Sequence, residues 1–344
     1  MIETTIRDIN ELEDRLSEPS ERVIETLFRV TGDILVLGAG GKMGPSLAHM
    51  AQRASQATGG QRRVIAVSRF SDSSVEQSLN RWGVETIRGD LFDPDFVDSL
   101  PETPNVVFML GFKFGSSENP ALTWATNVYL PMLICRRFAN SRIAAFSSGA
   151  VYGPIPVAPG AGSIETDAPD PVGEYSMSTV GRERMFEYFS QTQGTPVSIL
   201  RLNYATEMRY GVLIDLATQV FKGKPVHLEM GHVNVIWQGD ANAYALCSLE
   251  HASSPPLVMN MTGPDLIRCR EVCDQFAEKM NRPVSYHGEE GPTALLSNAS
   301  KAFDLYDRPR VSLDELVHWT ADWISRGGTT ANKPTHFEVT DGKY

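Results

Sequence analysis

The chain has 344 residues, of which 42% are hydrophobic and 21% are charged, as is typical of globular proteins. Its formal net charge of -11 argues against a non-specific nucleic-acid binder, because such proteins need surplus lysine and arginine to displace counterions. No apolar run approaches the roughly 18 residues that span a bilayer, and the polar, acidic N-terminus does not resemble an export signal. We therefore expect a cytoplasmic protein with neither nucleic-acid nor membrane partners.

The cysteines and histidines give little support for a disulfide or a metal site. The four cysteines show no Cys-x-x-Cys spacing, so reduced, buried thiols are expected. The only histidines that lie close together in the sequence, His227 and His232, are not spaced to share one helix face with a carboxylate. No metal site is predicted.

Residues 1–31 form the first predicted unit, an N-terminal helical extension. Their apolar residues recur at roughly helical spacing, which predicts two helices interrupted near Pro19. We expect this extension to cover an edge of the sheet, and a dimerisation arm is the alternative.

A buried strand followed by a glycine-rich turn begins at Ile34. Ile34 to Leu37 are apolar, and Gly38-x-x-Gly41-x-x-Gly44 follows them, ahead of an amphipathic helix. The first glycine permits a tight turn, the second lets the backbone approach a pyrophosphate, and the third lets the helix pack closely on the strand. Free N–H groups at the start of that helix would point at the phosphates. The predicted cofactor contacts of this loop are Gly38, Gly41, Lys42, Met43 and Gly44.

A second buried strand, residues 63–69, ends where a doubly wound sheet meets the adenosine ribose. The chain offers Ser68 and Arg69 at this point, where Asp or Glu usually meets a free 2′-hydroxyl. Arg69 suits a 2′-phosphate, and Lys42 could supply a second positive charge, so NADP is favoured over NAD. The alternative is that both cations simply point to water.

The next predicted strands, residues 84–88 and 105–110, each end in candidate cofactor contacts. Asp90 could accept a hydrogen bond from the adenine amino group while Leu91 covers the ring. Leu110, Gly111 and Lys113 follow the fourth strand, and Lys113 could reach a cofactor phosphate or a substrate anion; a solvated lysine is the alternative. A long helix is predicted over residues 118–140, with Asn127 midway and Pro131 kinking it.

A fifth strand, residues 142–148, runs into Ser147 and Ser148 at its carboxyl end. After a loop over residues 153–173, a long helix opens with Tyr175 in its first turn and Thr179 one turn further along the same face. Five strands that alternate with helices predict an α/β fold with a doubly wound parallel Rossmann sheet and a ligand crevice at the carboxyl ends of the strands.

Taken together, these motifs resemble the extended short-chain dehydrogenase/reductase superfamily, and within it the NAD-dependent epimerase/dehydratase family. The resemblance rests on the glycine triplet, Asp90-Leu91, Ser147-Ser148-Gly-Ala-Val-Tyr-Gly153, Glu174-Tyr175 and Arg201-Leu-Asn203, and it covers about residues 32–327. It implies that Tyr175 exchanges a proton with a substrate hydroxyl during hydride transfer to or from the nicotinamide. Ser148 would stabilise the negative charge that develops on the oxygen of that hydroxyl. It also implies a homodimer that pairs through the two long helices.

One position departs from the family pattern, because Thr179 stands where the family has the lysine of Tyr-x-x-x-Lys. The resemblance gives that lysine two roles, holding the nicotinamide ribose and favouring the tyrosinate. Thr179 can bind a ribose hydroxyl but carries no charge. If another cation replaces the lysine, we expect Lys113, because Arg182 and Arg184 lie further down the helix. The alternatives are a slow enzyme, a different base, or a dinucleotide-binding protein without turnover.

The remaining sequence predicts a smaller C-terminal substrate-binding lobe. We assign residues 32–202 to the NAD(P)-binding domain, residues 203–327 mainly to the substrate lobe, and residues 328–344 to a tail that is flexible or lies on a neighbour. Substrate contacts are predicted at Ser148, Gly149, Asn203 and Trp237, although Trp237 is equally typical of a core residue.

The sequence therefore predicts an NAD(P)-dependent oxidoreductase or epimerase that acts on a sugar or sugar-like hydroxyl compound. The alternative is a catalytically impaired dinucleotide-binding protein with a regulatory or scaffold role.

Overall fold

The computed structural model describes residues 5–339 and 341–343, and it is built around a seven-stranded parallel sheet. The strand order is β12-β7-β5-β4-β1-β2-β3, so that β1 lies near the centre and both neighbours pair with it in parallel. The strands are β1 (Ile34–Leu37), β2 (Val64–Ser68), β3 (Glu85–Arg88), β4 (Asn105–Phe108), β5 (Arg142–Ser148), β7 (Val197–Leu202) and β12 (Leu257–Met261). The predicted doubly wound fold is confirmed.

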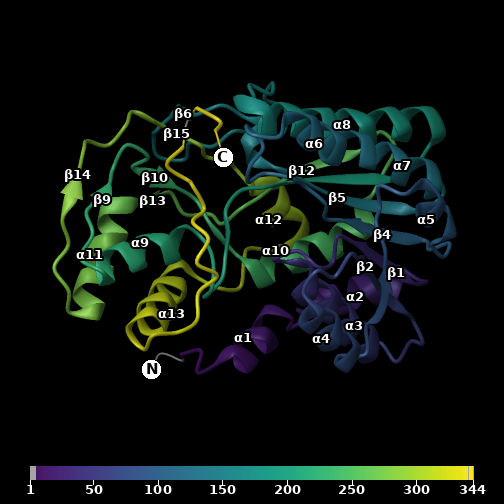
Figure 1. Cartoon of the computed structure of the whole chain (residues 1–344), viewed down its shortest axis with the longest axis horizontal. Coiled ribbons are helices and arrows are strands. Elements are labelled where there is room, and N and C mark those ends of the chain that lie inside the picture. The colour runs from purple at the N-terminus through teal and green to yellow at the C-terminus, as the bar shows by residue number, and fades with distance from the viewer. Residues whose placement is uncertain (1–4, 340, 344) are drawn as a thin grey trace.

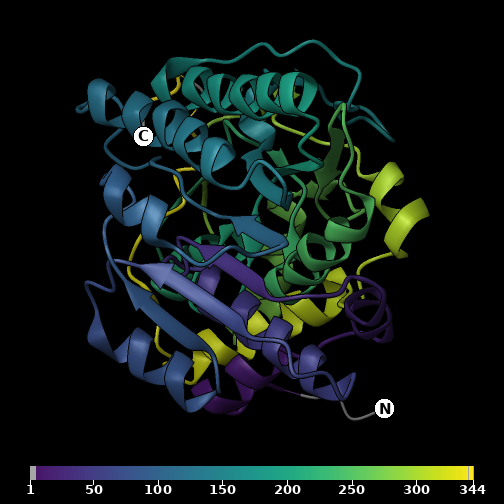
Figure 2. The ribbon, with the colours of Figure 1, turned by 90° about the vertical axis from the view of Figure 1, so that its right-hand side faces the viewer.

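Helices cover both faces of this sheet, as Figures 1 and 2 show. One face packs against α2 (Glu21–Arg29), α3 (Gly44–Ala57) and α10 (Gln238–Cys247). The other packs against α5 (Pro94–Ser99), α7 (Leu130–Arg137) and α8 (Gly173–Gln193). All four residues of β1 and of β4 are buried, because a parallel strand with helices on both sides has no face open to water.

The N-terminal extension forms the two predicted helices, α1 (Ile9–Leu16) and α2. Asp8 and Ser20 cap them, since each side chain accepts a hydrogen bond from a backbone N–H of the first turn. Both helices pack on α3 and α10, so within this chain they cover one helical layer of the Rossmann domain and not the expected edge of the sheet.

The helix predicted over residues 118–140 is divided into three pieces. α6 (Pro120–Trp124) leads into a π-helical turn, Ala125–Tyr129, and α7 follows with Pro131 in its first turn. Proline has no N–H to donate back into the preceding turn, which explains why the hydrogen-bond pattern changes there. Such π turns frequently occur at functional sites, and this one contains Asn127.

The C-terminal lobe packs α9 (Val212–Phe221), α11 (Cys269–Met280) and α13 (Leu313–Ser325) around its own apolar core. Ser312 and Glu315 form a capping box at the start of α13.

The shorter elements of the whole chain are α4 (Ser73–Arg81), α12 (Ser300–Tyr306), β6 (Ile155–Pro156), β8 (Ala205–Thr206), β9 (Val226–His227), β10 (His232–Val233), β11 (Ile236–Trp237), β13 (Ile267–Arg268), β14 (Tyr286–His287), β15 (Thr293–Ala294) and the 3₁₀ turns Gly149–Val151 and Ser248–His251.

The segment after α13, for which the sequence predicts a flexible tail or an arm on a neighbour, contacts other parts of this chain. It runs between the two lobes, as the yellow trace in Figure 1 shows. The Ala331 N–H donates to the Arg209 carbonyl, and the Thr335 N–H and hydroxyl both donate to Asp215 Oδ2 at 2.8 and 2.7 Å. Phe337 is buried. We call residues 331–339 the C-terminal strap.

All four cysteines are buried with free thiols, as expected. Burial raises the pKa of each thiol, to about 12 for Cys247 and Cys269. Among the described residues, no helix is both long and apolar enough to cross a bilayer.

Candidate active site

The glycine loop between β1 and α3 has the geometry of a phosphate cradle. Gly38 adopts φ +85°, a left-handed conformation that side chains disfavour. A Cβ on Gly44 would lie 2.5 Å from the Ala39 carbonyl oxygen, so only glycine lets α3 begin this close to the turn. No side chain caps the start of α3, which leaves its first N–H groups available to an anion.

A cavity of about 400 Å³ opens beside this loop at the carboxyl ends of the strands. It brings together the glycine loop, the loop after β4, the end of β5, the first turn of α8 and the C-terminal strap. Both predicted catalytic residues, Ser148 and Tyr175, line it. The other predicted site residues on its wall are Gly38, Gly41, Lys42, Met43, Gly44, Leu110, Gly111, Lys113 and Asn203.

The wall of this cavity is positively charged although the chain is acidic overall. Lys42, Lys113 and Arg182 line it, and none of its described lining residues is an aspartate or glutamate. Burial lowers the pKa of Lys113 to about 8. Desolvation, followed by repulsion from Lys333 and Lys113, lowers the pKa of Lys42 to about 8 as well. An anion in the cavity would offset both effects.

Two cations lie near Tyr175. Lys113 Nζ lies 5.9 Å from the centre of the Tyr175 ring and donates a hydrogen bond to the Thr335 carbonyl of the strap at 3.4 Å. Arg182 follows Tyr175 by two helical turns and lines the same cavity. Thr179, between them on α8, is fully buried and donates its hydroxyl to the Tyr175 carbonyl at 2.8 Å.

The Arg182 guanidinium is buried and held from three sides. Its Nη2 donates to Asn127 Oδ1 at 2.5 Å, and its Nη1 donates to the Phe146 carbonyl at 3.0 Å. A Cβ at Gly111 would lie 2.8 Å from Nη2, so the glycine makes room for it. Burial lowers the pKa of Arg182, while its interactions with Tyr175 and Glu183 oppose the shift. Its Nε is buried without a hydrogen-bond partner in the described chain.

Asn127 positions the wall of the cavity rather than lining it. Besides accepting from Arg182, its Oδ1 accepts from the Phe112 N–H, and its Nδ2 donates to Ser178 Oγ at 2.9 Å and to the Phe112 carbonyl. The amide therefore joins the π turn, α8 and the loop after β4.

A buried ion pair supports the end of β5 from behind. Arg201 donates from Nε and Nη2 to the two carboxylate oxygens of Glu183, at 2.9 and 2.7 Å. Ser147 donates its hydroxyl to the same carboxylate at 2.5 Å, while Arg201 Nη1 donates to the Tyr152 hydroxyl. Ser148 is left beside the cavity, where its Oγ accepts from the Ala150 N–H.

The residues predicted to meet adenosine lie at the ends of β2 and β3. Ser68 touches the glycine loop, because a Cβ at Gly40 would lie 2.5 Å from its Oγ. Arg69 and Asp90 are exposed, whereas Leu91 is buried in the core and lines neither this cavity nor the adjoining one. That second cavity, of about 710 Å³, shares Gly41 and Lys42 with the first and extends along α4.

The predicted substrate contacts fall into two groups. Asn203 lines the cavity and donates to Asn234 Oδ1 at 2.7 Å. Gly149 lies behind Asn203, and a Cβ there would meet Asn203 and Ser297 at 3.0 Å. Trp237 is 1% exposed and packs edge-on against Trp319, so it occupies the core position that its sequence context also allowed.

Sequence reasoning missed several residues on the cavity wall. The missed residues are Tyr210, Phe114, Gln238 and Thr335. The centre of the Tyr210 ring lies 3.1 Å from Lys42 Nζ. The sequence favours Lys113 over Arg182 because Arg182 lies further down the helix, but the structure places Arg182 on the wall as well. Its two-turn spacing from Tyr175 was the one available signal, since residues seven apart share a helix face.

The glycine cradle, the parallel sheet and the cavity at its carboxyl edge define an α/β protein built to bind a dinucleotide. The family model for the NAD dependent epimerase/dehydratase family matches residues 34–224, and the chain belongs to this family. No curated protein matches the chain.

Solved structures share the fold at low sequence identity. UDP-glucose 4-epimerase from Thermotoga maritima, with UDP-glucose, is 19% identical with a TM-score of 0.71, over 86% of this chain and 99% of that one. UDP-glucuronic acid 4-epimerase from Bacillus cereus, with UDP-glucuronic acid and NAD, is 17% identical with a TM-score of 0.71 and the same coverage. dTDP-glucose 4,6-dehydratase from Bacillus anthracis, with NAD, is 15% identical with a TM-score of 0.72, over 86% and 97%.

Proposed function

We propose that this protein is an NAD(P)-dependent oxidoreductase or epimerase that acts on a hydroxyl group of a sugar or sugar-like compound. The observation that carries the proposal is that Ser148 and Tyr175 line one cavity together with the glycine loop. Residues 32–202 would hold the cofactor, and residues 203–327 would supply most of the substrate side, beginning with Asn203.

In the proposed reaction, Tyr175 takes the proton of the substrate hydroxyl as the carbon loses its hydride, and the alcohol becomes a carbonyl. Ser148 donates a hydrogen bond to that oxygen as its charge changes. In the reverse direction Tyr175 returns the proton. The bound nicotinamide supplies the chemistry of accepting or returning the hydride.

We propose that Arg182 and Lys113 together replace the missing lysine charge. The small, internally bonded Thr179 leaves space along α8, so Arg182 reaches the cavity from one turn further down. A cation near a phenol favours its ionised form, and a buried cation acts more strongly than an exposed one. Both candidates are desolvated, but Lys113 has a pKa lowered to about 8 and loses its proton above that pH, whereas an arginine stays charged. We therefore propose Arg182 as the stronger of the two, in contrast to the preference for Lys113 from the sequence.

For the cofactor we propose NADP, with NAD as the alternative. The exposed Arg69 follows β2, and two carbonyls of its turn, those of Arg69 and Phe70, accept hydrogen bonds from Arg88, which steadies the turn. Two of the solved structures compared above carry NAD, so the preference rests on Arg69 and on Lys42 alone. The glycine cradle and the uncapped start of α3 fit either dinucleotide.

The substrate is proposed to carry a negative charge. Three cations and no carboxylate among the described lining residues favour anionic ligands in this cavity. A sugar acid satisfies this, and so does a nucleotide sugar of the kind that the epimerase structures hold.

The proposal is tested by incubating the purified protein with NADP⁺ or NAD⁺ and panels of sugars, sugar acids and nucleotide sugars. Reduction is followed at the nicotinamide band, and epimerisation by chromatography. We expect turnover that Tyr175→Phe and Ser148→Ala each lower by about 100-fold or more. If wild type and Tyr175→Phe are equally inactive while both still bind cofactor, the protein is instead a dinucleotide-binding regulator or scaffold.

A further inference from the structure

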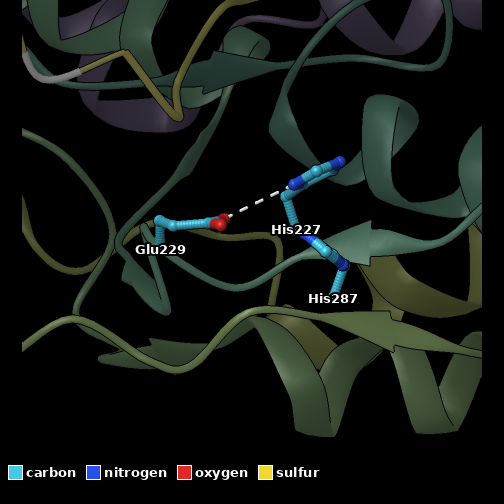
Figure 3. A group of neighbouring side chains, drawn as sticks. All are labelled: His227, Glu229 and His287. Atoms are coloured by element: carbon cyan, nitrogen blue, oxygen red, sulfur yellow. Dashed lines mark ion pairs between the residues drawn. The ribbon is translucent and has the colours of Figure 1, made fainter.

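Two histidines and a glutamate meet on the outer edge of the C-terminal lobe, away from the cavity. His227 ends β9 and His287 ends β14, and the two are direct partners in the parallel pairing of these strands. Glu229 follows His227 by two residues. Figure 3 shows the Glu229 carboxylate directed at the His227 ring, with His287 beside it on the neighbouring strand.

The distances within this group suit a shared ion. His227 Nδ1 lies 3.6 Å from Glu229 Oε2, and the two imidazole rings have centroids 5.0 Å apart. One ligand atom from each residue lies within 4.8 Å of the others. Tetrahedral ligands about 2.0–2.2 Å from one zinc ion stand about 3.3–3.6 Å apart, so the exposed side chains must close by about 1 Å to complete the site.

The backbone beneath the group is fixed. The Val226 N–H donates to the Ser285 carbonyl at 2.9 Å, and the Leu228 N–H donates to the His287 carbonyl at 3.1 Å. Gly288 adopts φ +76°, and a Cβ there would lie 2.6 Å from Glu229 Oε1. The glycine therefore leaves open the space that the carboxylate uses beside His287.

We propose that His227, Glu229 and His287 bind a divalent transition-metal ion, with Zn²⁺ as the best match. Two imidazole nitrogens and one carboxylate oxygen are ligands that zinc prefers, whereas Mg²⁺ and Ca²⁺ prefer oxygen alone. The three side chains are exposed, so the ion keeps contact with water, which fills the remaining coordination position.

The ion would join β9 to β14 rather than take part in hydride transfer. None of the three ligands lines the cavity, and β9 and β14 lie at the opposite end of the molecule from the sheet in Figure 1. Two segments far apart in the sequence would thus be linked at the edge of the substrate lobe.

The test is calorimetric titration of ZnCl₂ into untagged, full-length protein that has been treated with a chelator and dialysed. We expect one ion per chain, with affinity reduced at least about tenfold in His227→Ala, His287→Ala and Glu229→Gln. Zn²⁺ should also raise the unfolding temperature of the wild type and not that of the double histidine variant.

The matched controls are His251→Ala and Glu278→Gln, which alter a histidine and an exposed glutamate outside the group. Both should bind Zn²⁺ as the wild type does, and MgCl₂ should give no comparable heat. Failure of the wild type to bind, or equal binding by the ligand and control variants, would overturn the proposal. NADP⁺ binding by the variants, measured in parallel, verifies that they are folded and is independent of the metal.

Discussion

The guanidinium of Arg182 and the phenol of Tyr175 line one cavity from positions two turns apart on α8, with the buried Thr179 between them. We propose that this guanidinium supplies the positive charge that the family pattern places at residue 179. Asn127 in the π turn and the absence of a side chain at Gly111 hold it in place.

Replacing Arg182 by methionine should lower kcat by about 100-fold and move the pH at which oxidation reaches half its maximal rate upward, because the tyrosinate loses a neighbouring cation. Steady-state rates across a pH series measure both effects. A purely structural role predicts lower stability with an unchanged pH profile.

A rescue experiment adds Thr179→Lys to the Arg182→Met variant, which restores the lysine of the family pattern. We expect it to recover a substantial part of kcat and to move the profile back. Arg184→Met removes an exposed arginine of the same helix, which pairs with Glu187, and should leave both quantities unchanged.

Affinity for NADP⁺ should fall as the pH rises through about 8. Lys42 and Lys113 both have a pKa lowered to about 8, so they are charged below that pH and become neutral above it. Because the charged forms attract the phosphates, binding is tightest below pH 8, and a bound anion shifts the decline somewhat higher. Fluorescence titrations at a series of pH values measure this. Lys42→Met should weaken binding about tenfold and flatten the dependence, whereas a wild-type affinity independent of pH across this range would contradict the assignment.

Arg69→Asp should shift cofactor preference toward NAD, because a carboxylate repels the 2′-phosphate and accepts hydrogen bonds from a free 2′-hydroxyl. Dissociation constants for both cofactors give the ratio, which we expect to change by at least about tenfold. Arg142→Asp, an exposed arginine at the amino end of β5, is the control. An unchanged ratio would show that Arg69 does not meet the cofactor.

We propose a homodimer through α8 and the segment from α6 to α7. Large exposed apolar side chains gather on these helices, namely Leu122, Trp124, Tyr129, Met177 and Tyr188. Light scattering coupled to size exclusion should give twice the chain mass of 37.9 kDa, and Leu122→Glu with Tyr188→Glu should halve it. Phe28→Glu, at a more exposed apolar residue on α2, should not change the mass. A monomeric wild type would exclude this interface.

Features that depend on short stretches of sequence could be predicted. The glycine loop, the strands of the parallel sheet and the helix with Tyr175 in its first turn all follow from local patterns of apolar residues and glycines. Ser148 and Tyr175 reach one cavity because the parallel topology brings strand ends together, and that topology was itself readable from the alternation of strands and helices.

Features that depend on contacts between distant segments could not be predicted from the sequence. Arg182 enters the cavity because Asn127 and Gly111 accommodate it, and neither signals this in the sequence. His227 was paired with His232 by proximity in the chain, whereas the strand register pairs it with His287. Trp237, a predicted substrate contact, is instead buried in the core against Trp319.

The C-terminal strap gives the far end of the chain a direct hold on the site. Its Thr335 carbonyl accepts from Lys113, and its own hydroxyl and N–H are fastened to Asp215. One residue of the strap thus bridges Lys113 on the cavity wall and Asp215 on α9, so a substitution at Thr335 would disturb both neighbours at once.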